Sequence, residues 1–208
     1  MVRQIPVKGY FAESCYVYID DTTKHGFLID PGAEAERLLA LIRKNGWHID
    51  AILLTHGHFD HFGAVNELRQ MLGVPVYAHE ASGAYLTDPK FNLSIYCGPP
   101  MTVEHVESLR DGQTLTDEQA PSLGLRVLHT PGHTTDSVTL YDKAAGIAFV
   151  GDTIFKGSIG TDQYPGGNRA QLLRSIQTVI FSLPENTVLY SGHSAPTTVG
   201  IEKERYRI

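Results

Sequence analysis

The sequence predicts an α/β protein in which two β-sheets pack together and helices cover their outer faces. β-rich and helix-periodic segments alternate in the first part, strands predominate in the middle, and a helix and a strand follow. A weak internal sequence similarity is consistent with two similar halves, since ILLTHGHF (residues 52–59) resembles RVLHTPGHT (residues 126–134). With 208 residues the chain is long enough for a substantial core, so we assign residues 1–208 to a single domain.

The first half of the chain predicts alternating strands and helices. Two β-rich runs, residues 15–19 and 27–29, flank the polar turn DDTTKHG and predict a hairpin. Apolar residues at helical spacing predict a helix over residues 33–45, which Asn45-Gly46 ends. Beyond it we predict a buried strand at 49–54, a helix at 63–72, a strand at 74–78, and a short helix with a long loop between 80 and 100.

Strand signals dominate the second half. Asn168 is a good N-cap for a helix that runs to about Phe181, and the Gly-rich segment 157–167 before it predicts a loop. The expected strands cover residues 103–109, 123–128, 137–141, 147–150 and 187–190.

Composition and charge exclude several classes of protein. The net charge of −6 argues against nucleic acid or an anionic membrane as partner. The start, MVRQIPVKGYFAES, lacks the apolar stretch of a signal peptide, and no segment approaches membrane-spanning length. Cys15 and Cys97 are too few for a disulfide framework and are interpreted as reduced thiols. We expect a cytoplasmic protein that acts on a small molecule, and the sequence leaves its oligomeric state open.

A cluster of histidines follows the buried strand at residues 49–54. The stretch THGHFDHFG (residues 55–63) carries His56, His58, Asp60 and His61. Side chains two residues apart in a tight turn can point the same way, whereas the adjacent Asp60 and His61 do not easily share one direction. The spacing therefore indicates two neighbouring binding positions. Imidazole and carboxylate together suit Zn²⁺, Fe²⁺ or Mn²⁺.

Three later turns offer further metal ligands. His133 in TPGHT, Asp152 in FVGDT and His193 in YSGHS each follow a glycine and an apolar, β-like run. The glycine allows a tight turn that aims the next side chain. A single Gly-His pair is more often ordinary structure than a ligand. Because four strand-end turns all present His or Asp, we predict that they form one metal site.

These motifs carry a resemblance to a known family. In order and spacing they are similar to the metallo-β-lactamase superfamily, and the similarity covers nearly the whole chain, including Asp30-Pro31-Gly32. Within the superfamily the chain resembles glyoxalase II and its short relatives, through GDTIF, GSIG and PGGN. The resemblance implies an αβ/βα four-layer sandwich with the metal site at one edge of the two sheets.

The resemblance also implies how the ligands divide. His56, His58 and His133 are expected to hold one metal, and Asp152 to bridge it to a second metal held by Asp60, His61 and His193. We expect two zinc ions per chain, with iron or manganese as alternatives. Two cations about 3.5–4 Å apart can share a water and generate a metal-bound hydroxide near neutral pH. Asp60 is expected to act catalytically as well, by orienting this nucleophile.

Resemblance to glyoxalase II implies a metal-dependent hydrolase that cleaves a thioester such as S-lactoylglutathione. Two differences from glyoxalase II and its short relatives count against glutathione as part of the substrate. The chain ends shortly after His193, without the helical region that helps to clamp glutathione, and Thr161 stands where short relatives have an arginine. Without that arginine a substrate carboxylate loses a charge-assisted hydrogen bond. A smaller or different thioester or ester therefore stays open.

Other functions in the same superfamily fit the sequence less well than hydrolysis. A persulfide dioxygenase uses a single Fe²⁺, which His56, His133 and Asp152 would bind here, but the CGRTDF-type stretch of that branch is absent. A protein that only binds metal is disfavoured by the complete ligand set. β-Lactamase activity is disfavoured by the missing export signal, and RNA processing by the length. Five histidines fit no ligand position: His25, His48, His79, His105 and His129.

Overall fold

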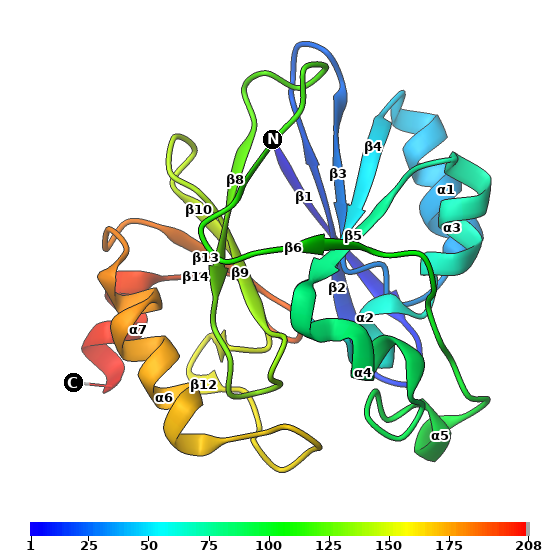
Figure 1. Ribbon diagram of the computed structural model, residues 1–208. Helices are drawn as coiled ribbons and strands as arrows, with labels where there is room; N and C mark the ends of the chain where they lie inside the picture. The colour runs from blue at the N-terminus through cyan, green and yellow to red at the C-terminus, as the bar shows by residue number, and fades with distance from the viewer. Residues whose placement is uncertain (207–208) are drawn as a thin grey trace.

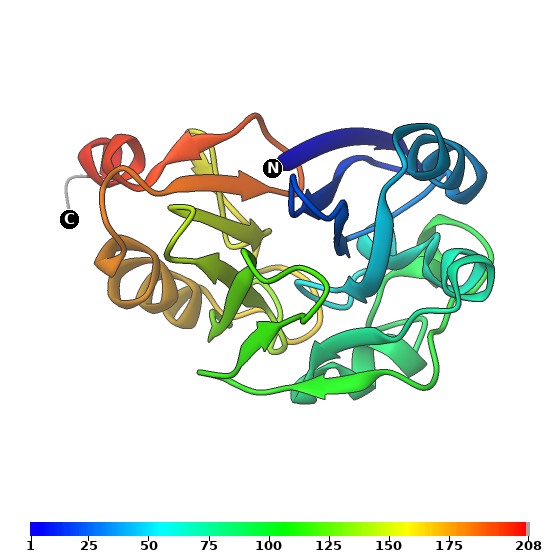
Figure 2. The same ribbon diagram turned by 90° about the horizontal axis from the view of Figure 1, so that it is seen from above.

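Two six-stranded sheets pack face to face between outer helices in the computed structural model, which describes residues 1–206 (Figures 1 and 2). In spatial order the first sheet holds β1 (Val2–Lys8), β2 (Ala12–Ile19), β3 (His25–Ile29), β4 (His48–Leu53), β5 (Val76–His79) and β6 (Glu107–Leu109). The second holds β14 (Thr197–Thr198), β13 (Val188–Ser191), β10 (Ile147–Gly151), β9 (Val138–Asp142), β8 (Gly124–His129) and β7 (Thr114–Thr116). A small hairpin pairs β11 (Ile154–Phe155) with β12 (Ser158–Ile159). The predicted α/β sandwich of four layers is confirmed.

Each outer layer is formed by helices that the apolar pattern places against a sheet. Helix α1 buries Leu38, Leu39 and Ile42 on one face, and Gly46 ends it with φ 64°. Two helices cover the outer face of each sheet: α1 (Ala35–Asn45) and α3 (Val65–Leu72) on the first, α6 (Arg169–Thr178) and α7 (Val199–Tyr206) on the second. Short helices lie in the loops: α2 (Phe59–Phe62), α4 (Gly83–Thr87), α5 (Ser94–Cys97) and the 3₁₀ turns Glu80–Ser82 and Ile180–Ser182.

A cluster of apolar residues fills the space between the two sheets, in addition to the clusters beneath the outer helices. Tyr16 and Phe27 from the first sheet share this cluster with Leu125 and Phe149 from the second. The rings of Tyr16 and Phe149 lie 5.3 Å apart, which ties the two sheets together directly. Because burying each such side chain contributes roughly 1.5–3 kcal/mol, this layer fixes how the sheet edges align.

Strand direction brings the predicted site turns to one edge. Strands β3, β4 and β5 run parallel, so the segments after β3 and β4 emerge together. Strand β9 is antiparallel to both β8 and β10, and β10 is parallel to β13. Strands β8, β10 and β13 therefore end on the same side of the second sheet. Their last residues precede the three Gly-His and Gly-Asp turns.

Several elements differ from the sequence-based prediction. Strand β1 was not predicted, because Gln4 and Pro6 dilute its alternating apolar pattern; as an edge strand it tolerates the proline. The strand predicted over 103–109 shrinks to β6. The carbonyls of Thr102 and Glu104 instead accept hydrogen bonds from the side chains of Asn66 and Arg69. The strands β7, β11, β12 and β14 and the helix α7 were also missed, and β12 falls in the segment 157–167 that was predicted to be a loop.

Two predicted local features are confirmed. Strands β2 and β3 form the expected antiparallel hairpin. The side chain of Asn168 accepts a hydrogen bond from the Gln171 backbone N–H at 3.0 Å and caps helix α6. The helix predicted over 63–72 is present as α3, which begins at Val65, whereas the short helix α2 just before it was not predicted.

Candidate metal centre

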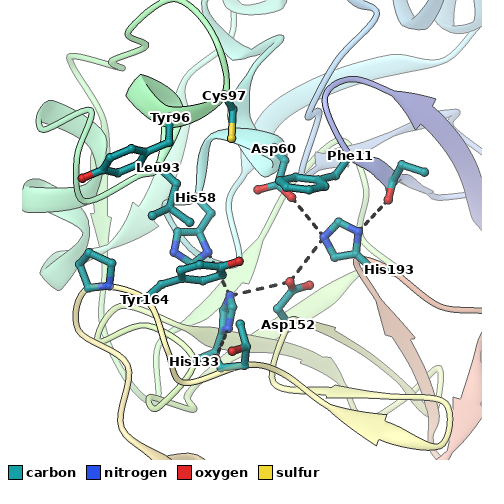
Figure 3. A pocket seen from close by; sticks show the side chains of 13 residues that line it. Phe11, His58, Asp60, Leu93, Tyr96, Cys97, His133, Asp152, Tyr164 and His193 are labelled. Atoms are coloured by element: carbon teal, nitrogen blue, oxygen red, sulfur yellow. Dashed lines mark hydrogen bonds and ion pairs between the residues drawn. The ribbon is translucent and has the colours of Figure 1, made fainter.

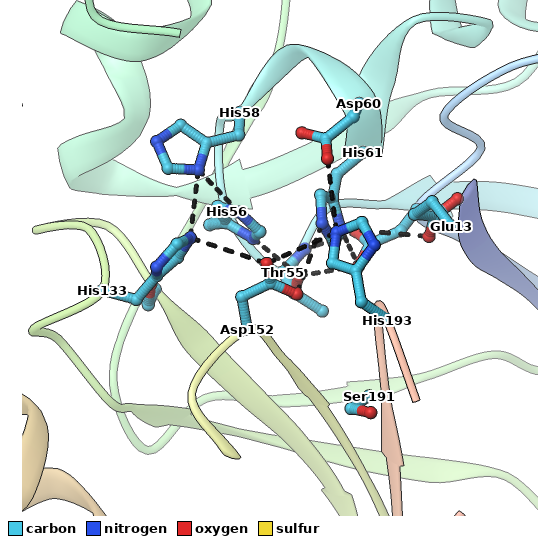
Figure 4. A network of polar contacts seen from close by, with 12 residues as sticks. Glu13, Thr55, His56, His58, Asp60, His61, His133, Asp152, Ser191 and His193 are labelled. Atoms are coloured by element: carbon cyan, nitrogen blue, oxygen red, sulfur yellow. Dashed lines mark hydrogen bonds and ion pairs between the residues drawn. The ribbon is translucent and has the colours of Figure 1, made fainter. Parts of the chain in front are cut away.

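The structure brings all seven sequence-predicted site residues to one edge of the sandwich (Figure 4). Four come from the segment after β4, and one each from the turns after β8, β10 and β13. They form three groups of three whose ligand atoms lie within 4.8 Å of one another, and the group of His56, His61 and Asp152 shares a residue with each of the other two. Asp60 and His61 belong to one group, so the expectation that these adjacent side chains point different ways is wrong. We call His56, His58 and His133 the three-histidine set, and Asp60, His61 and His193 the mixed set; Asp152 lies between the two.

Two glycines show why the local sequence takes this shape. Gly151 has φ 49°, and a Cβ there would lie 2.4 Å from the Thr55 hydroxyl oxygen, so a side chain is excluded both by strain and by contact. A Cβ on Gly192 would lie 2.5 Å from the Asp152 carboxylate. These glycines let the turns after β10 and β13 come close to residues 55–63, so that Asp152 and His193 reach the site.

The three-histidine set is buried. His58 Nδ1 lies 3.2 Å from His56 Nε2 and 3.0 Å from His133 Nε2. The exposed fractions of the three residues are 1%, 3% and 2% for His56, His58 and His133. Burial, and then the neighbouring His133, lowers the pKa of His58 to about 3. Burial also lowers the pKa of His56 well below its usual value, so both imidazoles are neutral at neutral pH.

The mixed set is partly open to solvent and carries opposite charges. His193 Nε2 lies 3.2 Å from the Asp60 carboxylate and 3.4 Å from that of Asp152. His61 Nε2 lies 3.5 Å from Asp152. Burial alone would lower the pKa of His61, but Asp152 and Asp30 raise it well above its usual value. Burial acts the other way on Asp152, where His61 and His193 outweigh it and lower the pKa.

Backbone and carboxylate acceptors orient three of the imidazoles. His133 Nδ1 donates to the Thr161 carbonyl at 2.7 Å, and His193 Nδ1 donates to the Ala12 carbonyl at 2.7 Å. His61 Nδ1 lies 3.1 Å from the Asp30 carboxylate. A carbonyl can only accept, so in the neutral imidazoles the Nε2 lone pairs point into the centre. Such orienting partners are typical of metal-binding histidines.

The donor set fits divalent cations. Lone pairs of imidazole nitrogens face one another and the carboxylates at 3.0–3.4 Å, which is repulsive unless a proton or a cation lies between them. Ligands about 2.0–2.1 Å from a tetrahedral Zn²⁺ are about 3.3 Å apart, close to these separations. Within residues 1–206, the buried atoms His61 Nε2 and Asp152 Oδ1 have no hydrogen-bond partner.

Two acidic residues behind the mixed set differ in how well their oxygens are satisfied. Asp30 accepts from the Thr55 backbone N–H and hydroxyl at 2.8 and 2.6 Å, besides its contact with His61. Glu13 is 3% exposed, and neither carboxylate oxygen has a hydrogen-bond partner among the described residues. Burial therefore raises the pKa of Glu13 well above its usual value. Sequence reasoning missed Glu13 because nothing in AESCYVYI marks it as buried.

A cleft of about 600 Å³ opens above the site (Figure 3). His58, Asp60, His133, Asp152 and His193 form its floor. Its walls come from three separate segments: Phe11, Ala12, Leu93, Tyr96, Cys97, Thr161, Tyr164 and Pro165. The resemblance pointed to Thr161 as a substrate-facing position, but no sequence pattern assigned a place in the walls to the others, because only the folded chain assembles these segments.

The remaining histidines and the cysteines lie outside the two sets. His79 and His129 stack on each other at 4.2 Å, and His25 stacks on His48 at 4.7 Å. Both cysteines are free. Cys15 packs in the core, whereas Cys97 lines the cleft.

Comparison with known proteins identifies the class of protein that this fold and site define. The sequence model of the metallo-beta-lactamase superfamily matches residues 9–193, so the chain belongs to this superfamily. Its members bind divalent metals and are generally metal-dependent hydrolases. Relatives that match almost the full chain include the following two. "Probable metallo-hydrolase YqgX" of Bacillus subtilis is 35% identical, over 98% of this chain and 94% of the relative. "Hydroxyacylglutathione hydrolase GloC" of Haemophilus influenzae is 32% identical, over 97% and 94%.

Solved structures agree with this assignment. The B3 metallo-beta-lactamase BLEG-1 superposes with a TM-score of 0.89 at 37% identity, covering 98% of this chain and 97% of its own. TTHA1623, in a di-iron-bound form, gives a TM-score of 0.83 at 34% identity, with 97% and 98% covered. ETHE1 from Myxococcus xanthus gives 0.79 at 26% identity, with 99% and 82% covered. Separately, none of the helices within residues 1–206 has the length and apolar character needed to cross a membrane.

Proposed function

We propose that the protein is a binuclear metal-dependent hydrolase that cleaves a thioester. One metal is assigned to the three-histidine set and the other to the mixed set, with Asp152 between them. Zinc is the proposed metal, with iron or manganese as alternatives. The observation that carries this proposal is the completeness of both sets, since a mononuclear site would not require the mixed set. GloC, named as a hydroxyacylglutathione hydrolase, supports the thioester as substrate class.

The chain's own residues have defined tasks in this reaction. Bound cations would lower the pKa of a water molecule and polarise the substrate carbonyl. Asp60 faces the cleft and stays ionised, because the His193 hydrogen bond and His61 together outweigh burial and lower its pKa. We assign Asp60 the task of accepting a hydrogen bond from the attacking water and orienting it. A C–O bond forms, the C–S bond breaks, and the thiol leaves with a proton, which gives an acid and a thiol.

We further propose that residues 1–208 work as one catalytic unit in the cytoplasm. Each sheet supplies only part of the site: the first contributes His56, His58, Asp60 and His61, and the second contributes the remaining three. Two free thiols fit a reducing compartment. Calorimetry should show a single cooperative unfolding transition, and two separate transitions would contradict the single unit. Cell fractionation tests the location, with recovery in the membrane or secreted fraction as the contrary result.

The central experiment measures metal content and reaction type together. We expect about two transition-metal ions per chain by mass spectrometry. Under anaerobic conditions a thioester panel that includes S-lactoylglutathione should release thiol, and chelation should abolish the release. Metal-free protein that remains fully active would refute the proposal.

A second candidate is a mononuclear iron oxidoreductase that acts on persulfides. The His-x-His-x-Asp-His motif, in which the chain resembles that branch of the superfamily, favours it, with His56, His133 and Asp152 as iron ligands. Glutathione persulfide in an oxygen electrode separates the two reactions. Stoichiometric oxygen uptake by an iron-loaded sample, without thioester cleavage, would favour the oxidoreductase.

Because BLEG-1 is described as a B3 metallo-beta-lactamase, the β-lactam nitrocefin should be assayed together with the thioesters.

A further inference from the structure

The walls of the cleft are apolar and aromatic. Phe11 comes from the turn between β1 and β2, Leu93 and Tyr96 from the segment around α5, and Tyr164 and Pro165 from the loop after β12. The ring of Tyr164 lies 5.8 Å from that of His58, edge to face, so this wall reaches the three-histidine set. Phe11 packs 6.2 Å from Phe59, and it stands on the side of the mixed set (Figure 3). An apolar group bound between these walls would touch both sides of the site.

Exposed apolar side chains concentrate at this cleft. Phe11, Tyr96 and Tyr164 line it and are 45%, 69% and 44% exposed. Of the large apolar residues that the described part of the chain leaves exposed, six lie on the three segments that form the walls: Tyr10, Phe11, Phe91, Ile95, Tyr96 and Tyr164. Only Met71 and Ile201 among them lie elsewhere. A concentration of this kind beside convergent polar groups is typical of a ligand site.

The cleft offers no fixed positive side chain. Neither lysine nor arginine occurs among its lining residues within residues 1–206, which include the carboxylates of Asp60 and Asp152 and the imidazoles of His58, His133 and His193. The Thr161 carbonyl is already engaged by His133. A substrate carboxylate or phosphate in the outer cleft would lose water without gaining a charge-assisted hydrogen bond. The net charge of −6 also disfavours the approach of anions.

We propose that the cleft binds the uncharged, apolar portion of the substrate, so that the preferred substrates are neutral thioesters with an aryl or short alkyl group. Glutathione thioesters, whose peptide portion carries carboxylates, are poor substrates. This inference rests on the proposed thioester hydrolysis, and it adds which part of the substrate the protein recognises. The aromatic walls contact the group beyond the reacting carbonyl, while the site residues face the carbonyl itself.

The first test compares three lactoyl thioesters that differ only in the thiol. The thiols are benzyl mercaptan, which is neutral and aromatic, N-acetylcysteamine, which is neutral and polar, and glutathione. We expect kcat/KM to fall in that order, with about tenfold or more between the benzyl and glutathione thioesters, because the apolar ring is buried on binding. A kcat/KM for the glutathione thioester equal to or above that of the benzyl thioester would overturn the inference.

Substitutions in the walls locate the effect. Tyr164→Ala should raise KM for the benzyl thioester about five- to tenfold and change the N-acetylcysteamine thioester much less. Thr161→Arg, which places a cation in the cleft, should raise kcat/KM for the glutathione thioester about tenfold. Met71→Ala and Ile201→Ala are matched controls, because both residues are exposed and apolar but lie away from the cleft. Equal losses on all three thioesters in Tyr164→Ala would contradict a role in recognition.

Binding separates failure of this inference from failure of the proposed function. The thioethers 2-(benzylthio)ethanol and S-(2-hydroxyethyl)glutathione cannot be hydrolysed, and saturation-transfer NMR detects their contact with the protein. One outcome is that no thioester is cleaved, but the benzyl thioether binds and Tyr164→Ala weakens its binding. The proposed thioester hydrolysis is then wrong, and the assignment of the cleft to an apolar group is supported. If the benzyl thioether does not bind, or the glutathione thioether binds more tightly, the assignment of the cleft is wrong.

Discussion

The three-histidine set and the mixed set lie side by side, yet they are built on different physical principles. His56, His58 and His133 are enclosed by the core, and burial keeps His56 and His58 neutral. In the mixed set His193 is partly exposed, and the histidines face carboxylates that raise their pKa values. The first set is prepared for a cation by desolvation, and the second by charge. Perturbing burial and perturbing charge should therefore affect the two sets differently.

Loss of an imidazole from the buried set is expected to have the largest effect. His58→Ala should remove most of one metal per chain and lower kcat/KM by about a thousandfold or more, since an empty position abolishes the paired site. Metal analysis and thioesterase assays measure both quantities. His48→Ala is the control, because His48 stacks on His25 away from the site. Two metals and full activity in His58→Ala would show that His58 is not a metal ligand.

Removal of one charge from the mixed set is expected to come next. Asp60→Asn keeps the size of the side chain but removes its negative charge, so we expect about one metal per chain and a fall in kcat of about a hundredfold. The metal that remains should be the one in the three-histidine set. Loss of both metals would indicate that the two sets do not bind independently.

Substitutions of the two acidic residues behind the mixed set, Asp30 and Glu13, are expected to have a smaller effect. Asp30→Asn weakens the acceptor of the His61 Nδ1 proton and should lower metal affinity by about 10- to 100-fold. Asparagine tolerates the positive φ of 49° at this position, so the backbone should be preserved. Glu13→Gln is the control: its carboxyl is held neutral by burial, and a neutral amide should change metal affinity less than about threefold. Equal effects of both changes would argue against an orienting role for Asp30.

The smallest effect concerns the stability of the metal-free protein. The pKa of His58 is about 3 when folded, far below its value in the unfolded chain. The unfolded state therefore binds more protons between these values, and stability is lost as the pH falls below about 6.5. Between pH 7 and pH 5 the loss attributable to His58 is about 2 kcal/mol. Urea unfolding of chelated protein should show a shallower pH dependence in His58→Gln, and an unchanged slope would contradict the prediction.

Sequence patterns were informative wherever a feature is local. The hairpin of β2 and β3, the cap at Asn168 and the presentation of His56, His58, Asp60 and His61 in one turn depend on residues that are neighbours in the chain. Edge strands and the residues that line the cleft walls were harder to predict from the sequence. Strand β1 is held by its pairing with β2, and Tyr96 by a loop whose position depends on the rest of the fold.

The sequence by itself determined which donors are available and that His56, His58, Asp60 and His61 follow one strand together, because residues within one turn are held close by local backbone geometry. Only the tertiary structure decided that the turns after β8, β10 and β13 reach those donors, that Glu13 is buried without a partner, and that aromatic residues from three loops enclose the cleft. Those outcomes depend on how two sheets align through the packing between them, and no short stretch of sequence carries that alignment.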